Sequence, residues 1–149
     1  MIVFRISRER YARDLSGTGA RIYGGRWNAK GTSLLYTAES RALAAMELAV
    51  HTDMNDLFDD LQLVTLSVPG QDLLALDPLP SHWNQHPPHP ASQRVGEQFV
   101  TEGKALILKV PSVVIRGDYN YLINPGHTGF QQIEIVSIEP FQFDQRLIK

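Results

Sequence analysis

Two glycines followed directly by an arginine form the stretch of this chain with the clearest chemical potential, and the stretch reads Gly24, Gly25, Arg26, Trp27 and Asn28. Glycine lets a backbone come close to a ligand. The planar arginine side chain offers several N–H donors that match two oxygens of a phosphate. The pattern therefore predicts an anion site at this loop. Taken alone, an arginine after two glycines is more often a solvated turn residue.

A carboxylate follows on the buried face of an expected helix. Residues 38–51 are rich in alanine, and Thr37 or Ser40 can act as the N-cap. The buried stripe is predicted from apolar residues at spacings of three and four: Leu43, Met46 and Val50. Glu47 lies in the same stripe, four residues after Leu43. Because a buried carboxylate is costly unless it is paired, Glu47 is expected either in a structural ion pair or in a functional site.

Length and composition limit the classes of protein to which this chain can belong. The 149 residues are expected to form one domain, residues 1–149, that buries about 68% of its unfolded surface. There is no cysteine, which excludes disulfides, thiol nucleophiles and cysteine-ligated metals and is compatible with the cytoplasm, where we expect the protein. No apolar run approaches the ~18 residues of a membrane span, and Arg5 comes too early for a signal peptide.

Charge and motif spacing argue against several ligands. The net charge is -2, with acids and bases interspersed, so no direct contact with nucleic acid is expected. Neither nucleotide-binding glycine motif is satisfied, since Gly25 and Arg26 stand where a phosphate loop needs Gly-Lys-Ser/Thr. The histidines at 82, 86 and 89 match no metal motif, and the acidic residues 53–60 lack the spacing of a calcium loop. No metal is predicted.

The remaining segments predict an α+β fold of short strands without a regular strand–helix–strand alternation. Residues 2–6 alternate as a half-buried strand would, and residues 17–20 open a loop. Residues 92–102 predict a helix with Gly103 after its end. Further strands are expected at residues 32–36, 61–68, 73–76, 105–110, 113–115, 119–125 and 133–138. Polar residues fall at several strand ends, where they would either face a cleft or serve as ordinary turn residues: Ser112, Asn120, Asn124 and His127.

The order of these motifs resembles the RES domain, a family named for its Arg, Glu and Ser and known as the toxin half of Xre–RES toxin–antitoxin pairs. The resemblance covers essentially the whole chain. One departure is Tyr119, where many members carry Trp. The matching residues are Gly17-Thr18-Gly19-Ala20, Gly24 to Asn28, Gly31, Tyr36-Thr37-Ala38, Ala44, Glu47, Val110-Pro111-Ser112, Asn120, Asn124-Pro125 and His127.

The resemblance implies a compact fold similar to ADP-ribosyltransferases and the diphtheria-toxin group. It also implies toxicity through depletion of NAD+, with NAD+ as a substrate and no other cofactor, and a helix-turn-helix antitoxin of the Xre family as partner. A homodimer is left open. By motif position the catalytic set is Arg26, Tyr36, Glu47 and Ser112. The residues carried over as substrate-binding are Gly25, Trp27, Asn28 and Asn124.

Roles for this set follow from the chemistry of the nicotinamide–ribose bond. Cleavage releases a neutral group and leaves an oxocarbenium-like ribose, which Glu47 can stabilise. Arg26 is expected to grip the pyrophosphate, and Tyr36 to stack on the nicotinamide or ribose. Ser112 is expected to orient the substrate; a rival role is nucleophile, for which His127 would have to be the activating base.

Three functional classes remain open. The first is an NAD+ glycohydrolase or phosphorylase; the second is an ADP-ribosyltransferase acting on a protein; the third is a non-catalytic NAD-binding module. The second is disfavoured by Ala45, because arginine-directed ADP-ribosyltransferases resemble one another in carrying a further Glu two residues before the catalytic one, and this chain has Ala there. Glu39 or a residue of the turn at Ser112 could still reach the cleft from elsewhere in the fold. Residues 17–28 and the loop around Trp83 are the expected antitoxin contacts.

Overall fold

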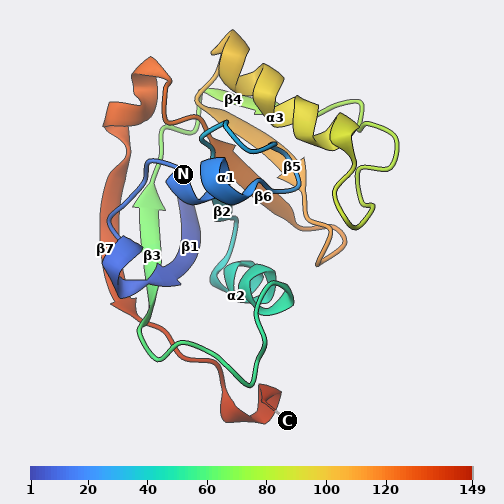
Figure 1. The fold of residues 1–149 in the computed structure, drawn as a ribbon. Coiled ribbons are helices and arrows are strands. Elements are labelled where there is room, and N and C mark those ends of the chain that lie inside the picture. Colours follow the sequence, from blue (N-terminus) through green and yellow to red (C-terminus); the bar gives the residue numbers. More distant parts are fainter. Residues whose placement is uncertain (149) are drawn as a thin grey trace.

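One seven-stranded sheet in the order β4-β5-β6-β2-β1-β3-β7 organises the computed structural model, which describes residues 1–148 (Figure 1). The strands are β1 (Ile2–Arg8), β2 (Leu35–Ala38), β3 (Leu61–Ser67), β4 (Leu73–Ala75), β5 (Ile107–Pro111), β6 (Tyr119–Ile123) and β7 (Glu134–Pro140). The helices are α1 (Thr18–Tyr23), α2 (Arg41–Val50) and α3 (Pro90–Glu102), with three short 3₁₀ turns: η1 (Glu9–Tyr11), η2 (Thr128–Gln132) and η3 (Gln145–Leu147). The α+β prediction is confirmed.

Strand pairing is antiparallel except between β4 and β5, which run parallel. The chain crosses from β4 to β5 through α3, so the fold contains one strand–helix–strand unit. One unit of this kind is no regular alternation, so the expectation of a fold without regular strand–helix–strand alternation is confirmed. Because β4 has three residues and a long proline-containing loop separates it from α3, this single unit leaves little trace in the sequence.

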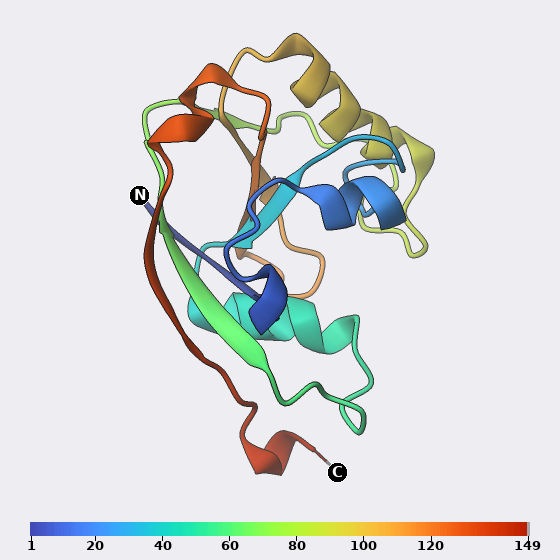
Figure 2. The same cartoon turned by 60° about the vertical axis from the view of Figure 1, so that its left-hand side comes forward.

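Both faces of the sheet are covered. In β1, Val3 packs into one core cluster while its neighbour Phe4 packs against α2 on the opposite face. The prediction of a half-buried first strand is therefore wrong, because Val3 and Phe4 are both buried although they lie on opposite faces of β1. Figure 2 shows α2 crossing the β1–β3 part of the sheet and α3 lying at the other end, near β4 and β5.

Helix α2 begins after Ser40, whose side chain accepts a hydrogen bond from the Leu43 N–H at 3.0 Å. This confirms Ser40 as the cap, while Ala38 belongs to β2. The predicted buried stripe is wrong in part: Leu43 is buried, but Met46 is 39% and Val50 54% exposed. Ala44 faces inward instead, since its small side chain lets α2 approach Phe4 closely. Alanine carries little periodic signal, which is why the stripe was misplaced.

Residues expected in a loop form the short helix α1. Gly17 precedes it with φ 72°, and a Cβ there would lie 2.6 Å from the backbone nitrogen of Leu34. Only glycine fits this close approach. A six-residue helix has too few turns to show periodicity. Conversely, residues 113–115 are not a strand but part of a turn between β5 and β6, and this turn contributes to the site.

Candidate active site

Glu47 is held by residues from two other elements. Its Oε1 accepts a hydrogen bond from the Ser112 hydroxyl at 2.8 Å and from the Asn120 side-chain amide at 2.7 Å. Ser112 directly follows β5, and Asn120 lies in β6. Among residues 1–148, Glu47 forms no salt bridge and its Oε2 has no hydrogen bond, so the structural ion-pair alternative does not hold within the described chain.

Ser112 is a buried support for Glu47. Its oxygen accepts hydrogen bonds from the backbone N–H groups of Val114 and Ile115, both at 3.1 Å, so its proton is directed at the carboxylate. His127 does not activate it, because its Nδ1 accepts from the Gly129 N–H at 2.9 Å and its Nε2 lies 3.5 Å from Asp72. The nucleophile role would require His127 to activate Ser112, and the structure contradicts that pairing.

Arg26 lies within the electrostatic field of Glu47. Burial lowers the pKa of its guanidinium, and the negative charge of Glu47 opposes that shift. Its Nη1 donates to the carbonyls of Trp83 and Gln85, at 3.0 and 2.7 Å, which ties it to the loop before α3. In the described chain its Nε and Nη2 make no hydrogen bond, so the edge of the guanidinium that carries these two nitrogens is available to an anion.

Tyr36 supports the arginine loop, residues 24–28, through two hydrogen bonds. Its hydroxyl donates to the side-chain oxygen of Asn28 at 2.6 Å and accepts from the backbone N–H of Trp27 at 3.1 Å. Burial raises the pKa of Tyr36, so the hydroxyl keeps its proton. The structure gives Tyr36 a positioning role in addition to the stacking role expected from the sequence.

Trp27 and Asn28 are buried and cannot touch a ligand with their side chains in this structure. Asn28 donates to the carbonyls of Ala20, Ala29 and Thr32 at 2.8, 3.1 and 3.1 Å. Trp27 stacks on Trp83 with ring centroids 6.4 Å apart. The expectation of direct substrate contact from these side chains is therefore corrected: they shape the loop that presents Arg26.

Gly25 is required by close packing. A Cβ at this position would lie 2.8 Å from the Tyr36 hydroxyl oxygen, so any side chain would displace that group. The Gly25 carbonyl also accepts a hydrogen bond from Gln93 of α3 at 3.2 Å. The loop is thus held between β2 and α3, and Gly25 leaves room for both contacts.

Asn124 lies away from the Glu47 cluster. It follows the opposite end of β6 from Asn120, four residues away or roughly 13 Å at about 3.3 Å per residue. It is buried, and its side-chain oxygen accepts from the Gly126 N–H at 2.9 Å. The structure therefore does not bring Asn124 to Glu47. Asn120, which the sequence marks only as a polar residue at a strand end and a family match, is the asparagine that contacts Glu47. This contact depends on the sheet register, in which Asn120 pairs with Val110 and Ala38.

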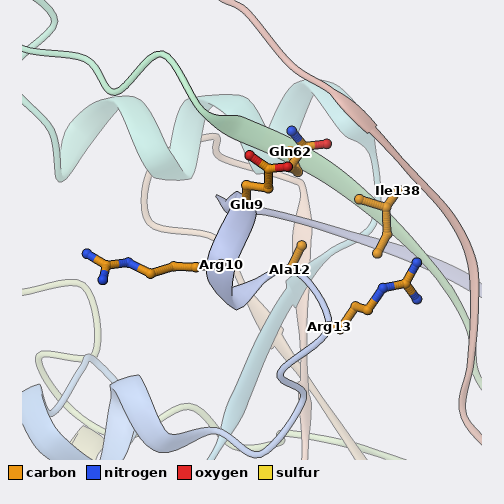
Figure 3. Close-up of a pocket in the computed structure, with 6 residues that line it drawn as sticks. All are labelled: Glu9, Arg10, Ala12, Arg13, Gln62 and Ile138. Atoms are coloured by element: carbon orange, nitrogen blue, oxygen red, sulfur yellow. The ribbon is translucent and has the colours of Figure 1, made fainter.

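Two surface hollows lie apart from this cluster. One of about 420 Å³ is bordered by Asn124. Another, of about 300 Å³, lies between η1, β3 and β7, and Figure 3 shows Arg10 pointing away from the other residues that line it. Its lining residues are Glu9, Arg10, Ala12, Arg13, Gln62 and Ile138, none of which belongs to the predicted set. In residues 1–148, no three histidine or acidic residues are grouped to hold a metal, and no helix could cross a membrane.

Tyr36→Phe tests the support of the loop. The variant leaves the Asn28 oxygen and the Trp27 N–H without a partner, and we expect the free energy of unfolding to fall by about 1–3 kcal/mol in urea denaturation. The matched control is Tyr23→Phe, because Tyr23 is 79% exposed and should be neutral. Equal unfolding midpoints for the two variants would contradict the positioning role.

The chain belongs to the RES domain family, whose model matches residues 2–144. Two similar relatives are "Toxin Res" of Photorhabdus laumondii, 35% identical over 100% of this chain and 98% of the relative, and "Prs ADP-ribosylating toxin" of a Sphingobium species, 36% identical over 93% and 89%. A chain in the crystal structure of the M. tuberculosis MbcT-MbcA toxin-antitoxin complex superposes with a TM-score of 0.75, 19% identity and coverage of 95% of this chain and 84% of that one. This likeness supports the shared fold.

Proposed function

We propose that this protein is the toxin of a toxin–antitoxin pair and that it cleaves the nicotinamide–ribose bond of NAD+. The proposal is supported by relatives that are themselves named toxins. The observation that carries the chemistry is the arrangement of Glu47, whose Oε1 is occupied by Ser112 and Asn120 and whose Oε2 is left for a substrate.

Cleavage of this bond suits a site with one carboxylate. Nicotinamide leaves as a neutral group from a cation, so no acid is needed to protonate it. The developing positive charge on the ribose requires a fixed negative charge nearby. Oε2 of Glu47 supplies that charge, and the two donors on Oε1 prevent the carboxylate from rotating away.

Arg26 holds the pyrophosphate in this proposal. The N–H groups on its Nε and Nη2 are free in the described chain, while Nη1 donates to carbonyls of the Trp83 loop and so fixes the guanidinium in place. Water or phosphate would then attack the ribose, giving ADP-ribose or its phosphate. NAD+ is the substrate, no metal takes part, and the reaction takes place in the cytoplasm, where the NAD+ pool is available.

Arg26→Lys is expected to raise KM for NAD+ by about 10- to 100-fold. A lysine is a point charge that cannot hold both the loop carbonyls and a phosphate, and one hydrogen bond to a charged group contributes about 1.5–3 kcal/mol. Steady-state kinetics measures the change, with Arg21→Lys on the exposed surface of α1 as control. An unchanged KM would place the pyrophosphate elsewhere.

A second candidate is transfer of ADP-ribose to a protein, which the name of the Sphingobium relative favours. The geometry of this chain favours it less. Ala45 stands two residues before Glu47, and the carboxylate of Glu39 is already engaged, since it accepts a hydrogen bond from the Tyr119 N–H at 3.0 Å. The site therefore offers one acid, and we expect proteins to be minor acceptors.

An antitoxin of the Xre family is proposed to silence the site by covering its entrance. Exposed apolar side chains on the two helices that border the arginine loop and Glu47 suit such a contact: Ile22 and Tyr23 on α1, Met46 and Val50 on α2. Copurification with the antitoxin should abolish NAD+ turnover. Full turnover by the purified pair would contradict occlusion.

Induction of the chain in a bacterial host tests the function itself. We expect the cellular NAD+ concentration to fall before growth stops, and to stay at its initial value when Glu47→Gln is induced to the same protein level. Growth arrest by the unmodified chain at an unchanged NAD+ concentration would overturn the proposed function.

A further inference from the structure

We infer that Asn120 is a positioning residue that fixes which oxygen of Glu47 meets the substrate. Its kinetic consequence rests on the proposed function, whereas the contact itself is independent of it. The amide nitrogen of Asn120 lies 2.7 Å from Oε1, the shorter of the two hydrogen bonds to this carboxylate.

The backbone of Asn120 is held on both sides. Asn120 pairs with Val110 of β5 and with Ala38 of β2, so it lies in the interior of the sheet. Its neighbour Tyr119 donates its N–H to Glu39, and the Tyr119 ring lies under the Lys109 ammonium at 4.1 Å. Ser112, by contrast, lies at the start of a turn. Asn120 therefore provides the more rigid reference point for Glu47.

Both groups on Oε1 act as donors in this geometry. An amide nitrogen can only donate. The Ser112 oxygen already accepts two backbone N–H groups, so its proton points to Oε1. A proton or a ribose hydroxyl therefore has to meet Glu47 at Oε2. The charge that opposes the oxocarbenium is thereby fixed at one position.

Substitution of Asn120 should separate turnover from binding. Asn120→Ala frees the carboxylate to rotate, and we expect kcat to fall on the order of 100-fold, since a displacement of about 1 Å costs this much. KM should change by less than about twofold, because Arg26 is untouched. Asn120→Asp, of equal size, places a second carboxylate against Oε1 and should be at least as damaging.

Two comparisons distinguish positioning from general damage. Asn55→Ala, in the exposed loop before β3, should leave kcat and the unfolding midpoint unchanged. Ser112→Ala combined with Asn120→Ala should lose less than the product of the two single losses, since both residues hold the same oxygen. Wild-type kcat in Asn120→Ala, or fully multiplicative losses in the double variant, would overturn the inference.

An NMR measurement tests the contact without turnover. The side-chain NH₂ protons of Asn120 should resonate downfield in the unmodified chain and move upfield in Glu47→Ala, where the acceptor is gone. Unmoved resonances would refute the contact. If the unmodified chain leaves NAD+ intact while these resonances do move, the proposed function fails and the positioning of Glu47 by Asn120 stands.

Discussion

Glu47→Gln is expected to lower kcat for NAD+ cleavage by about 1,000-fold, the upper end of what removal of one electrostatic group costs in comparable sites. The amide can keep its oxygen toward Ser112 and Asn120 and turn its NH₂ toward the substrate, so the hydrogen bonds on Oε1 persist. Volume and packing are unchanged. The loss therefore reports the missing charge, and nicotinamide release by the purified variant measures it.

Glu134→Gln is the matched control. Glu134 is an exposed acid on the edge strand β7, which β2, β1 and β3 separate from the strand β6 that carries Asn120. Its turnover should remain within about twofold of the unmodified chain, as expected for a group that makes no contact in the transition state. Near-normal cleavage by folded Glu47→Gln would show that the acid of the site lies elsewhere.

Gly96→Ala is expected to cause the largest loss of stability. A Cβ on Gly96 of α3 would lie 1.8 Å from the carbonyl oxygen of Trp27, so the helix has to move away from the arginine loop. Overpacking of this kind lowers the free energy of unfolding by about 3 kcal/mol. For a chain of this size the melting temperature should fall by about 6–12 °C. Calorimetry measures the shift.

Gly19→Ala provides the opposite comparison. Gly19 lies in α1, and a Cβ there meets no atom within 4 Å. Replacing a helical glycine by alanine should raise stability by about 0.5–1 kcal/mol. If both variants melt at the temperature of the unmodified chain, the close packing of α3 on the Trp27 backbone would be refuted.

The strands and the longer helices were predictable because their signals are local. Residue type predicts Gly103 after α3 and offers Ser40 as one of two caps for α2, and the structure has both, since their backbone conformations favour those residues. The parallel pairing of β4 with β5 was not predictable, because it depends on contacts between distant segments. Helix α1 was missed for a different reason, as it is too short for a periodic pattern.

The site residues likewise divide into those that local sequence predicts and those whose roles depend on the tertiary fold. Glu47 and Ser112 were identified from residue type and family resemblance, and the structure brings them together. Choosing between Asn120 and Asn124 required the direction of β6, since only one end of that strand faces Glu47. The buried roles of Trp27 and Asn28 also depend on the tertiary fold, because nothing in a glycine-rich loop indicates which side chains turn inward.

Incubation of the purified chain with adenine-labelled NAD+ and a cell extract tests the central claim most directly. We expect nicotinamide to be released and the label to appear in an equal amount of soluble ADP-ribose or its phosphate, with both products formed about 1,000-fold more slowly by Glu47→Gln. Absence of nicotinamide release by the unmodified chain, or transfer of the label to one protein in an amount equal to the nicotinamide released, would contradict the account.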